Sequence, residues 1–285
     1  MILMNRFSAL LDDIALLWNK YGSSYVSGIA NTLLLAVIAT LIGCIIGFLC
    51  GILQTIPRSR NDHIVKRTLL GLLRGIIRAY IEIFRGTPMI LQAVFIYYGL
   101  PYFTNNAVQF RNIWAVSILV VSINTGAYMA ESVRGGILSV DRGQTEGAKA
   151  IGMTHFQTML SVVLPQALRN IMPQIGNNFI INVKDTSVMF IIGFNDFFAV
   201  HKAVAGSTYR FFPSAAIEMV GYLTMTLIAS FLLRKLEKLL AGRSNYDLVC
   251  EDPLVATAGT YNYPGKGSPY DEVNREQGAW KENGK

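Results

Sequence analysis

A short run of polar residues, Lys184-Asp185-Thr186-Ser187, interrupts an apolar stretch that otherwise extends from residue 166 to residue 200. A carboxylate such as Asp185 can pair with the ammonium or guanidinium group of a ligand, and the two hydroxyl groups can donate hydrogen bonds to a ligand carboxylate. Two other interpretations fit equally well: Lys184 and Asp185 form an internal pair, or the interruption is a hinge. The run is therefore one candidate ligand site.

Two asparagines just before this run are a second candidate. Asn178 and Asn182 are four residues apart, so both lie on one face of a helix, and Gly176 would allow another helix to approach closely. The amides could line a ligand pathway. Polar and small residues also serve contacts between helices in a bilayer, and both interpretations stay open.

A third set of polar residues follows helical spacing between residues 112 and 134. Asn124, Tyr128 and Glu131 recur on one face, and Arg134 follows three residues after the glutamate. We expect Asn124 and Tyr128 to line a pathway together with the residues above. Glu131 and Arg134 lie at the end of the segment, where an ion pair that acts as a gate or fixes the helix orientation is more plausible than a ligand contact.

These residues must be positioned by helices that cross a membrane. The chain has 285 residues, of which 52% are hydrophobic and only 15% are charged, whereas soluble domains carry about 25% charged residues. Residues 29–53 contain no charge, and about 20 apolar residues suffice to span a bilayer as a helix. The sequence therefore predicts an all-α integral membrane protein with about five transmembrane helices, at about 28–54, 79–101, 112–134, 166–200 (interrupted) and 213–234.

The positions of the basic residues predict the orientation of the spans. Residues 55–78, residues 135–165 with Arg134 and Arg169 at their edges, and the chain from Arg234 onward together hold more Lys and Arg than the segments that alternate with them. Basic residues favour cytoplasmic loops, so we expect the N-terminus outside and the C-terminus in the cytoplasm.

The two ends of the chain differ from its centre. Residues 1–27 include charges that break the apolar pattern and lack the features of a cleavable signal peptide, so we expect a short interfacial helix there. Residues 28–237 form the predicted membrane domain. Residues 243–285 are rich in Gly, Pro and polar residues, and such segments bury too little apolar surface to fold, which predicts a disordered cytoplasmic tail.

Several functions are excluded or disfavoured. The net charge of +7 comes from bases at the ends of apolar segments, which indicates membrane orientation and not nucleic-acid binding. The three histidines are far apart and the three cysteines lack CxxC spacing, so neither a metal site nor a disulfide framework is predicted. No Gly-x-x-x-x-Gly-Lys-Ser/Thr phosphate loop is present, so the chain is not expected to hydrolyse ATP itself.

The polar segment between the third and fourth predicted spans has its own helix signals. Gln144 to Ile151 is compatible with a helix, and Gly152 suits the left-handed cap that ends one. Thr154 and Gln157 have capping-box spacing, and Pro165 fits a helix start. We therefore expect two short helices at an angle. From these features alone, they could dock into a groove of another protein or lie on the membrane surface.

The same segment carries a family resemblance. Glu146-Gly-Ala148, Gly152 and Val162-x-Leu164-Pro165 resemble the EAA loop of permease subunits in type I ATP-binding-cassette (ABC) importers, with Gly147 and Val162 as departures from the pattern. Further motifs resemble the polar amino-acid subfamily of these permeases: Arg85-Gly-Thr-Pro88, Tyr97-Tyr-Gly-Leu-Pro101, Ala127-Tyr-x-x-Glu131-x-x-Arg134-Gly-Gly-Ile137, Gly143-Gln144 and Lys184-Asp-Thr-Ser187.

The resemblance implies a MetI-like permease fold in a bacterial cytoplasmic (inner) membrane and import of a polar amino acid by alternating access. It implies a separate ATPase dimer that binds MgATP, a second permease copy or a paralogue, and an extracytoplasmic amino-acid-binding protein. This chain would then bind no cofactor and no nucleic acid. The ATPase would dock on residues 141–165, at Glu146, Gly147, Ala148, Gly152, Met153, Phe156, Leu164 and Pro165.

Three other functions are alternatives to a polar amino-acid permease. The nearest alternative is a permease of the same kind for another small polar solute, such as an opine or an amino-acid derivative. A channel or secondary transporter would need ion-coupling carboxylates repeated in two halves, and a membrane enzyme would need a nucleophile or metal cluster; neither pattern is visible in the sequence.

Overall fold

The computed structural model describes residues 2–56 and 63–241, and every regular element in this part of the chain is helical. The predicted all-α class is confirmed. The predicted disordered tail, residues 243–285, lies outside the described residues.

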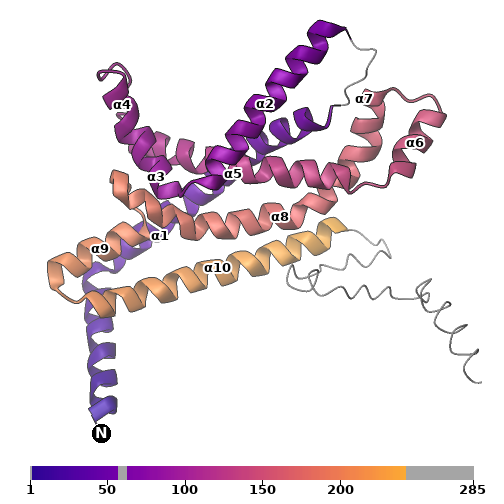
Figure 1. The fold of residues 1–285 in the computed structure, drawn as a ribbon. Helices are drawn as coiled ribbons and strands as arrows, with labels where there is room; N and C mark the ends of the chain where they lie inside the picture. The colour runs from indigo at the N-terminus through magenta and orange to yellow at the C-terminus, as the bar shows by residue number, and fades with distance from the viewer. Residues whose placement is uncertain (1, 57–62, 242–285) are drawn as a thin grey trace, which may run out of the picture. The chain divides into compact units, whose positions relative to one another are not determined.

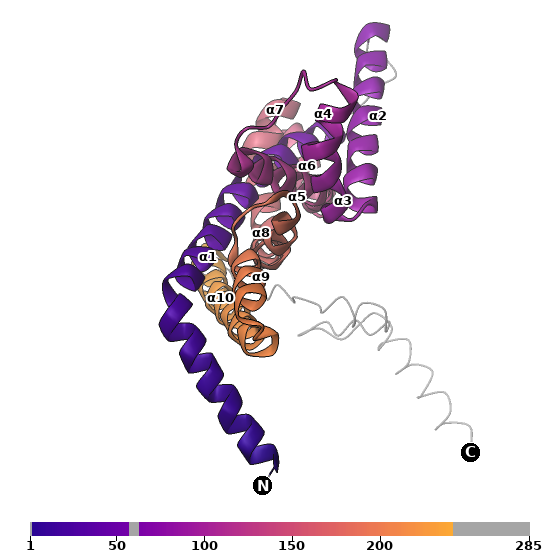
Figure 2. The same ribbon diagram turned by 90° about the vertical axis from the view of Figure 1, so that its left-hand side faces the viewer.

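The first helix, α1, runs without a break from Ile2 to Thr55. A separate short helix over residues 1–27 was expected, and this expectation is wrong: the charges near the N-terminus do not end the helix. Figures 1 and 2 show that the first turns of α1 project away from the other helices. The later turns pack against several of them.

The second predicted span, residues 79–101, is not one helix. Helix α2 (Ile64–Gly86) ends before Pro88, and the chain turns by 111° into a second helical segment, which consists of α3 (Met89–Val94), the π-helical turn η1 (Phe95–Gly99) and α4 (Leu100–Phe103). A proline disfavours helical backbone in the residue before it, and Thr87 is indeed extended (φ −121°, ψ 145°).

Two further long helices are candidate spans. Helix α5 (Ile113–Leu138) starts at Asn112, whose side chain accepts hydrogen bonds from two backbone N–H groups, and α10 extends from Phe211 to Ala241. Among residues 2–56 and 63–241, three helices are long and apolar enough to cross a membrane, or up to five spans if each of two bent pairs counts as one. The predicted number of about five is consistent with this range.

The polar segment folds as the sequence predicts up to residue 157. Helix α6 (Arg142–Ala150) ends near Gly152, which has a positive φ of 86°, and Thr154 and Gln157 form a capping box at the start of α7 (His155–Thr158). The expectation that the second helix is short is wrong, however. Helix α7 continues through the π-helical turn η2 (Met159–Val163) into α8 (Leu164–Asp185).

The interruption predicted at residues 184–187 is a change of helix type. The chain passes from α8 into the 3-10 helix η3 (Thr186–Ile192) without a break. The bend of 53° comes later, before α9 (Phe197–Thr208). Gly193 ends η3 with a φ of 88°, a conformation that suits glycine.

Helices α1 and α5 pack closely because glycines line one face of α1. Gly43, Gly47 and Gly51 are four residues apart and lie against Thr125, Met129 and Val133 of α5. Small residues at this spacing allow two backbones to approach in a membrane. This contact holds α5, which carries Asn124, Tyr128 and Glu131.

A buried hydrogen-bonded group joins α1, α9 and α10. Ser214 Oγ lies 2.8 Å from the Tyr25 hydroxyl and 2.9 Å from His201 Nδ1. His201 Nε2 lies 3.7 Å from a carboxylate oxygen of Glu218. These contacts stabilise the packing of α1, α9 and α10 against one another.

Candidate functional site: two neighbouring cavities

The larger polar cavity lies between the bend after α2, the middle of α5 and the C-terminal half of α8. Its volume is about 460 Å³. It brings together five residues that the sequence proposed for a pathway: Asn124, Tyr128, Asn178, Asn182 and Asp185. Arg85, Gly86, Thr87, Pro88, Met89, Thr125 and Ile181 complete the lining.

One wall of this cavity is the chain bend itself, which Gln92 holds in place. The Gln92 amide donates hydrogen bonds to the carbonyl oxygens of Phe84 and Thr87, each at 2.9 Å. Asn124 Nδ2 donates to the Gln92 side-chain oxygen at 3.0 Å and to Phe84 O at 3.1 Å. The last carbonyls of a helix have no partner within it, so these amides satisfy α2 where it stops.

The two asparagines of α8 make contacts between helices and also line the cavity. Asn182 is only 5% exposed, and its amide nitrogen lies 2.7 Å from Thr40 Oγ1 and 2.9 Å from Thr125 Oγ1. Asn178 donates to Gln174 O at 2.9 Å and contacts the sulfur of Met129 at 3.3 Å. The pair therefore joins helices and also lines a cavity, and a role in a ligand pathway stays a prediction.

Arg85 stands between the larger cavity and a second one. Its guanidinium forms an ion pair with Glu131 and lies 5.4 Å from the centre of the Tyr128 ring, a cation–π distance. The prediction that Glu131 pairs with Arg134 is wrong: among the described residues, Glu131 forms its ion pair with Arg85. The motif containing Arg85 comes from the preceding helix, so helical spacing within α5 could not reveal it.

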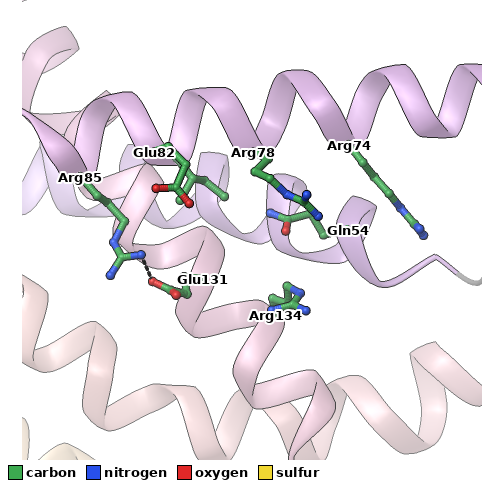
Figure 3. Close-up of a pocket in the computed structure, with 8 residues that line it drawn as sticks. Gln54, Arg74, Arg78, Glu82, Arg85, Glu131 and Arg134 are labelled. Atoms are coloured by element: carbon green, nitrogen blue, oxygen red, sulfur yellow. Dashed lines mark ion pairs between the residues drawn. The ribbon is translucent and has the colours of Figure 1, made fainter.

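The second cavity has a volume of about 290 Å³ and lies between α1, α2 and α5 (Figure 3). Arginines and glutamates dominate its lining, which consists of Gln54, Arg74, Arg78, Ile81, Glu82, Arg85, Glu131 and Arg134.

Three residues of the polar run lie outside the larger cavity. Lys184 is exposed, Thr186 is fully buried and donates to Val183 O at 3.1 Å, and Ser187 is half-buried. Helical geometry explains this result, because consecutive residues of α8 and η3 point in different directions. Of the four, only Asp185 lines the cavity.

Sequence reasoning missed three functional candidates, Arg85, Thr87 and Gln92, which line the cavity or hold its wall. The sequence Arg85-Gly-Thr-Pro88 contained a signal for the bend, because a proline disfavours helical backbone in the residue before it. The free polar groups at such a helix end make it a candidate site.

The α6–α7 segment exposes apolar side chains. Ile151 is 80% exposed and Phe156 is 72% exposed, next to the exposed Glu146, Gly147 and Gly152. Ala148 is buried, Met153 and Leu164 are half-buried, and Pro165 is exposed. Within residues 2–56 and 63–241, no three His, Cys, Asp or Glu side chains come close enough to hold a metal ion.

Comparisons with known proteins agree with this architecture. Residues 64–242 match the family described as "Binding-protein-dependent transport system inner membrane component". The glutamine transport system permease protein GlnP of Escherichia coli (strain K12) is 32% identical over 213 residues, which cover 75% of this chain and 91% of GlnP. The arginine transport system permease protein ArtQ of Bacillus subtilis (strain 168) is 31% identical over 216 residues, 75% of this chain and 90% of ArtQ.

A solved structure also matches. A chain from the "Crystal structure of an amino acid ABC transporter with histidines" superposes with a TM-score of 0.66 at 33% identity, covering 78% of this chain and 97% of that one. The family match extends over more than half of the sequence, and the relatives are covered almost completely. The chain therefore belongs to the family of binding-protein-dependent transport system inner membrane components, the MetI-like permease subunits of ABC transporters.

Proposed function

We propose that this chain is the multi-pass permease subunit of an ABC importer and that its substrate is a polar amino acid, bound in the cavity of Arg85 and Asp185. The juxtaposition of one cationic and one anionic side chain in a single cavity carries this proposal.

The charges of the cavity match those of an amino acid. The Arg85 guanidinium has five N–H donors, so beside its ion pair with Glu131 it can also donate to a substrate carboxylate. The Asp185 carboxylate can bind the ammonium group. Thr87 and Asn124 offer further polar groups in the same lining. A volume of about 460 Å³ also falls within the range of about 300–1,000 Å³ that is usual for small-molecule sites.

The relatives support this class of substrate. GlnP and ArtQ are named for glutamine and arginine transport, and the matched crystal structure is that of an amino acid ABC transporter. A permease for an opine or another amino-acid derivative is the alternative, because such solutes keep a carboxylate and an amine.

The coupling partner is an ATPase dimer that binds MgATP and docks on residues 141–165. The exposed Ile151 and Phe156 support this assignment, since exposed apolar residues mark sites of protein contact. In this proposal a second permease copy or a paralogue completes the translocation path, and an extracytoplasmic binding protein delivers the amino acid. The chain then lies in a bacterial inner membrane with its N-terminus outside and its C-terminus in the cytoplasm.

Energised uptake of a panel of radiolabelled amino acids tests the proposal, in cells with and without this chain. Loss of uptake of one amino acid would identify the substrate. An unchanged panel that includes amino-acid derivatives would contradict the proposed substrate class.

The cavity is tested by Asp185→Asn, with Asp12→Asn as a matched control because Asp12 is exposed on α1. Loss of the ammonium partner should raise the KM for uptake about tenfold or more, as expected for a charge-assisted hydrogen bond worth about 1.5–3 kcal/mol. Both variants should retain ATPase docking. An unchanged KM for Asp185→Asn would show that Asp185 has only a structural role.

A further inference from the structure

We propose that the second cavity, between α1, α2 and α5, binds a phosphate-type oxyanion, either the headgroup of an anionic phospholipid or a free phosphate ion. Figure 3 shows Arg78 and Gln54 directed toward the space between α2 and α5, with Arg134 on the opposite wall. This site shares Arg85 with the amino-acid cavity, but the proposal does not depend on the substrate proposed above.

The balance of charge in the lining favours an anion. Four arginines and two glutamates line the cavity, which leaves a formal excess of two positive charges. Glu131 is paired with Arg85, and Glu82 is one helical turn from Arg78. Among the described residues, neither Arg78 nor Arg134 has an ion pair with a carboxylate.

Unsatisfied hydrogen-bond donors point to the same conclusion. Gln54 Nε2 and Arg74 Nε are buried and have no hydrogen-bond partner. Arg74 is held by another of its nitrogens, which donates to the carbonyl oxygen of Ile56 near the end of α1. A buried donor without a partner is costly, and a small rotation of either side chain toward an oxyanion in the cavity would give its donor an acceptor.

Phosphate fits this arrangement better than a single carboxylate does. A phosphate group presents several acceptor oxygens, so Arg78, Arg134 and Gln54 can bind it from different helices at once. The planar guanidinium of arginine can also donate two parallel hydrogen bonds to one phosphate. The opposite face of α2 exposes Leu69, Leu72, Ile76 and Ile83. This exposed apolar face suits contact with the acyl chains of a bilayer, and the phospholipids of that bilayer carry phosphate groups.

The first experiment uses the full-length chain in a neutral detergent and native mass spectrometry during titration with dioleoylphosphatidylglycerol or dioleoylphosphatidylcholine. We expect wild type to retain one phosphatidylglycerol per chain saturably, with little retention of phosphatidylcholine. Arg78→Gln/Arg134→Gln should bind phosphatidylglycerol at least about tenfold more weakly. The matched control Arg6→Gln/Arg111→Gln removes two exposed charges and should bind like wild type.

The second experiment measures thermal unfolding of delipidated protein in potassium phosphate and in potassium chloride of equal ionic strength. Selective stabilisation of wild type by phosphate, absent in Arg78→Gln/Arg134→Gln, would identify free phosphate as a ligand. Selective binding of phosphatidylglycerol without this effect would identify the lipid headgroup.

If the double variant does not fold, Gln54→Leu removes the unpaired donor without a change in charge and should weaken binding of the same probe. The proposal is overturned if wild type binds neither probe selectively. It is also overturned if the cavity variants bind the probes as tightly as wild type does.

Discussion

The contact between α1 and α5 leads to a sharp prediction at Gly47. A Cβ atom placed on this residue would lie 2.3 Å from Met129 Cβ and 2.9 Å from the Met129 backbone carbonyl carbon. Met129 is fully buried, so neither its side chain nor its backbone can move aside freely. Gly47→Ala should therefore push the two helices apart although alanine is the better helix former.

The expected cost follows from overpacking of a closely packed contact, which is about 1–3 kcal/mol. The matched control is Gly75→Ala on α2, where an added Cβ would have no neighbour within 4 Å. This change should be neutral or stabilising by up to about 1 kcal/mol, because alanine replaces glycine inside a helix.

The assay is thermal unfolding of the purified full-length chain in detergent, with wild type and both variants measured side by side. A lower melting temperature for Gly47→Ala and an equal or higher one for Gly75→Ala would agree with the structure. If Gly47→Ala were as stable as wild type, the close approach of α1 and α5 would be refuted.

Three other substitutions have expected outcomes. Gly152→Arg should leave membrane insertion intact but uncouple ATP hydrolysis from uptake, because the positive φ of 86° disfavours a side chain there; normal ATP-driven uptake would contradict this. Asn182→Leu should lower stability by about 1–3 kcal/mol, since Thr40 and Thr125 would lose a buried hydrogen-bond partner, and a melting temperature equal to that of wild type would rule this out. Ser214→Ala should also destabilise the chain by about 1–3 kcal/mol because it removes the hydroxyl shared by a buried tyrosine and a buried histidine; denaturant unfolding measures the loss, and Ser132→Ala, at a partly exposed hydroxyl, should cost less.

Local signals in the sequence were sufficient for several features of this protein. The charge-free tract of residues 29–53 requires a membrane span because no soluble surface could accommodate it. Gly152 and the capping box of Thr154 and Gln157 fixed the turn between α6 and α7, since each interaction is made within a few residues. The motifs around Glu146 and Arg85 identified the family for the same reason.

Features that depend on distant contacts could not be predicted in this way. Hydropathy placed one span across residues 79–101, but a single proline splits it into two helices at 111°. The interruption at residues 184–187 was visible as composition, yet only Asp185 faces the cavity. Hydropathy reports how apolar a segment is and does not register a turn, whereas the direction in which Asp185 points depends on how α8 packs.

The amino-acid sequence by itself determined the membrane class, the approximate number of spans, the turn between α6 and α7 and the family, because these depend on composition and on neighbours along the chain. Only the tertiary structure decided that Glu131 pairs with Arg85 and that Gln92 supports the bend. It also decided that Arg85 and Asp185, 100 positions apart in the sequence, line one cavity. These are contacts between different helices, and helix packing alone sets which side chains meet.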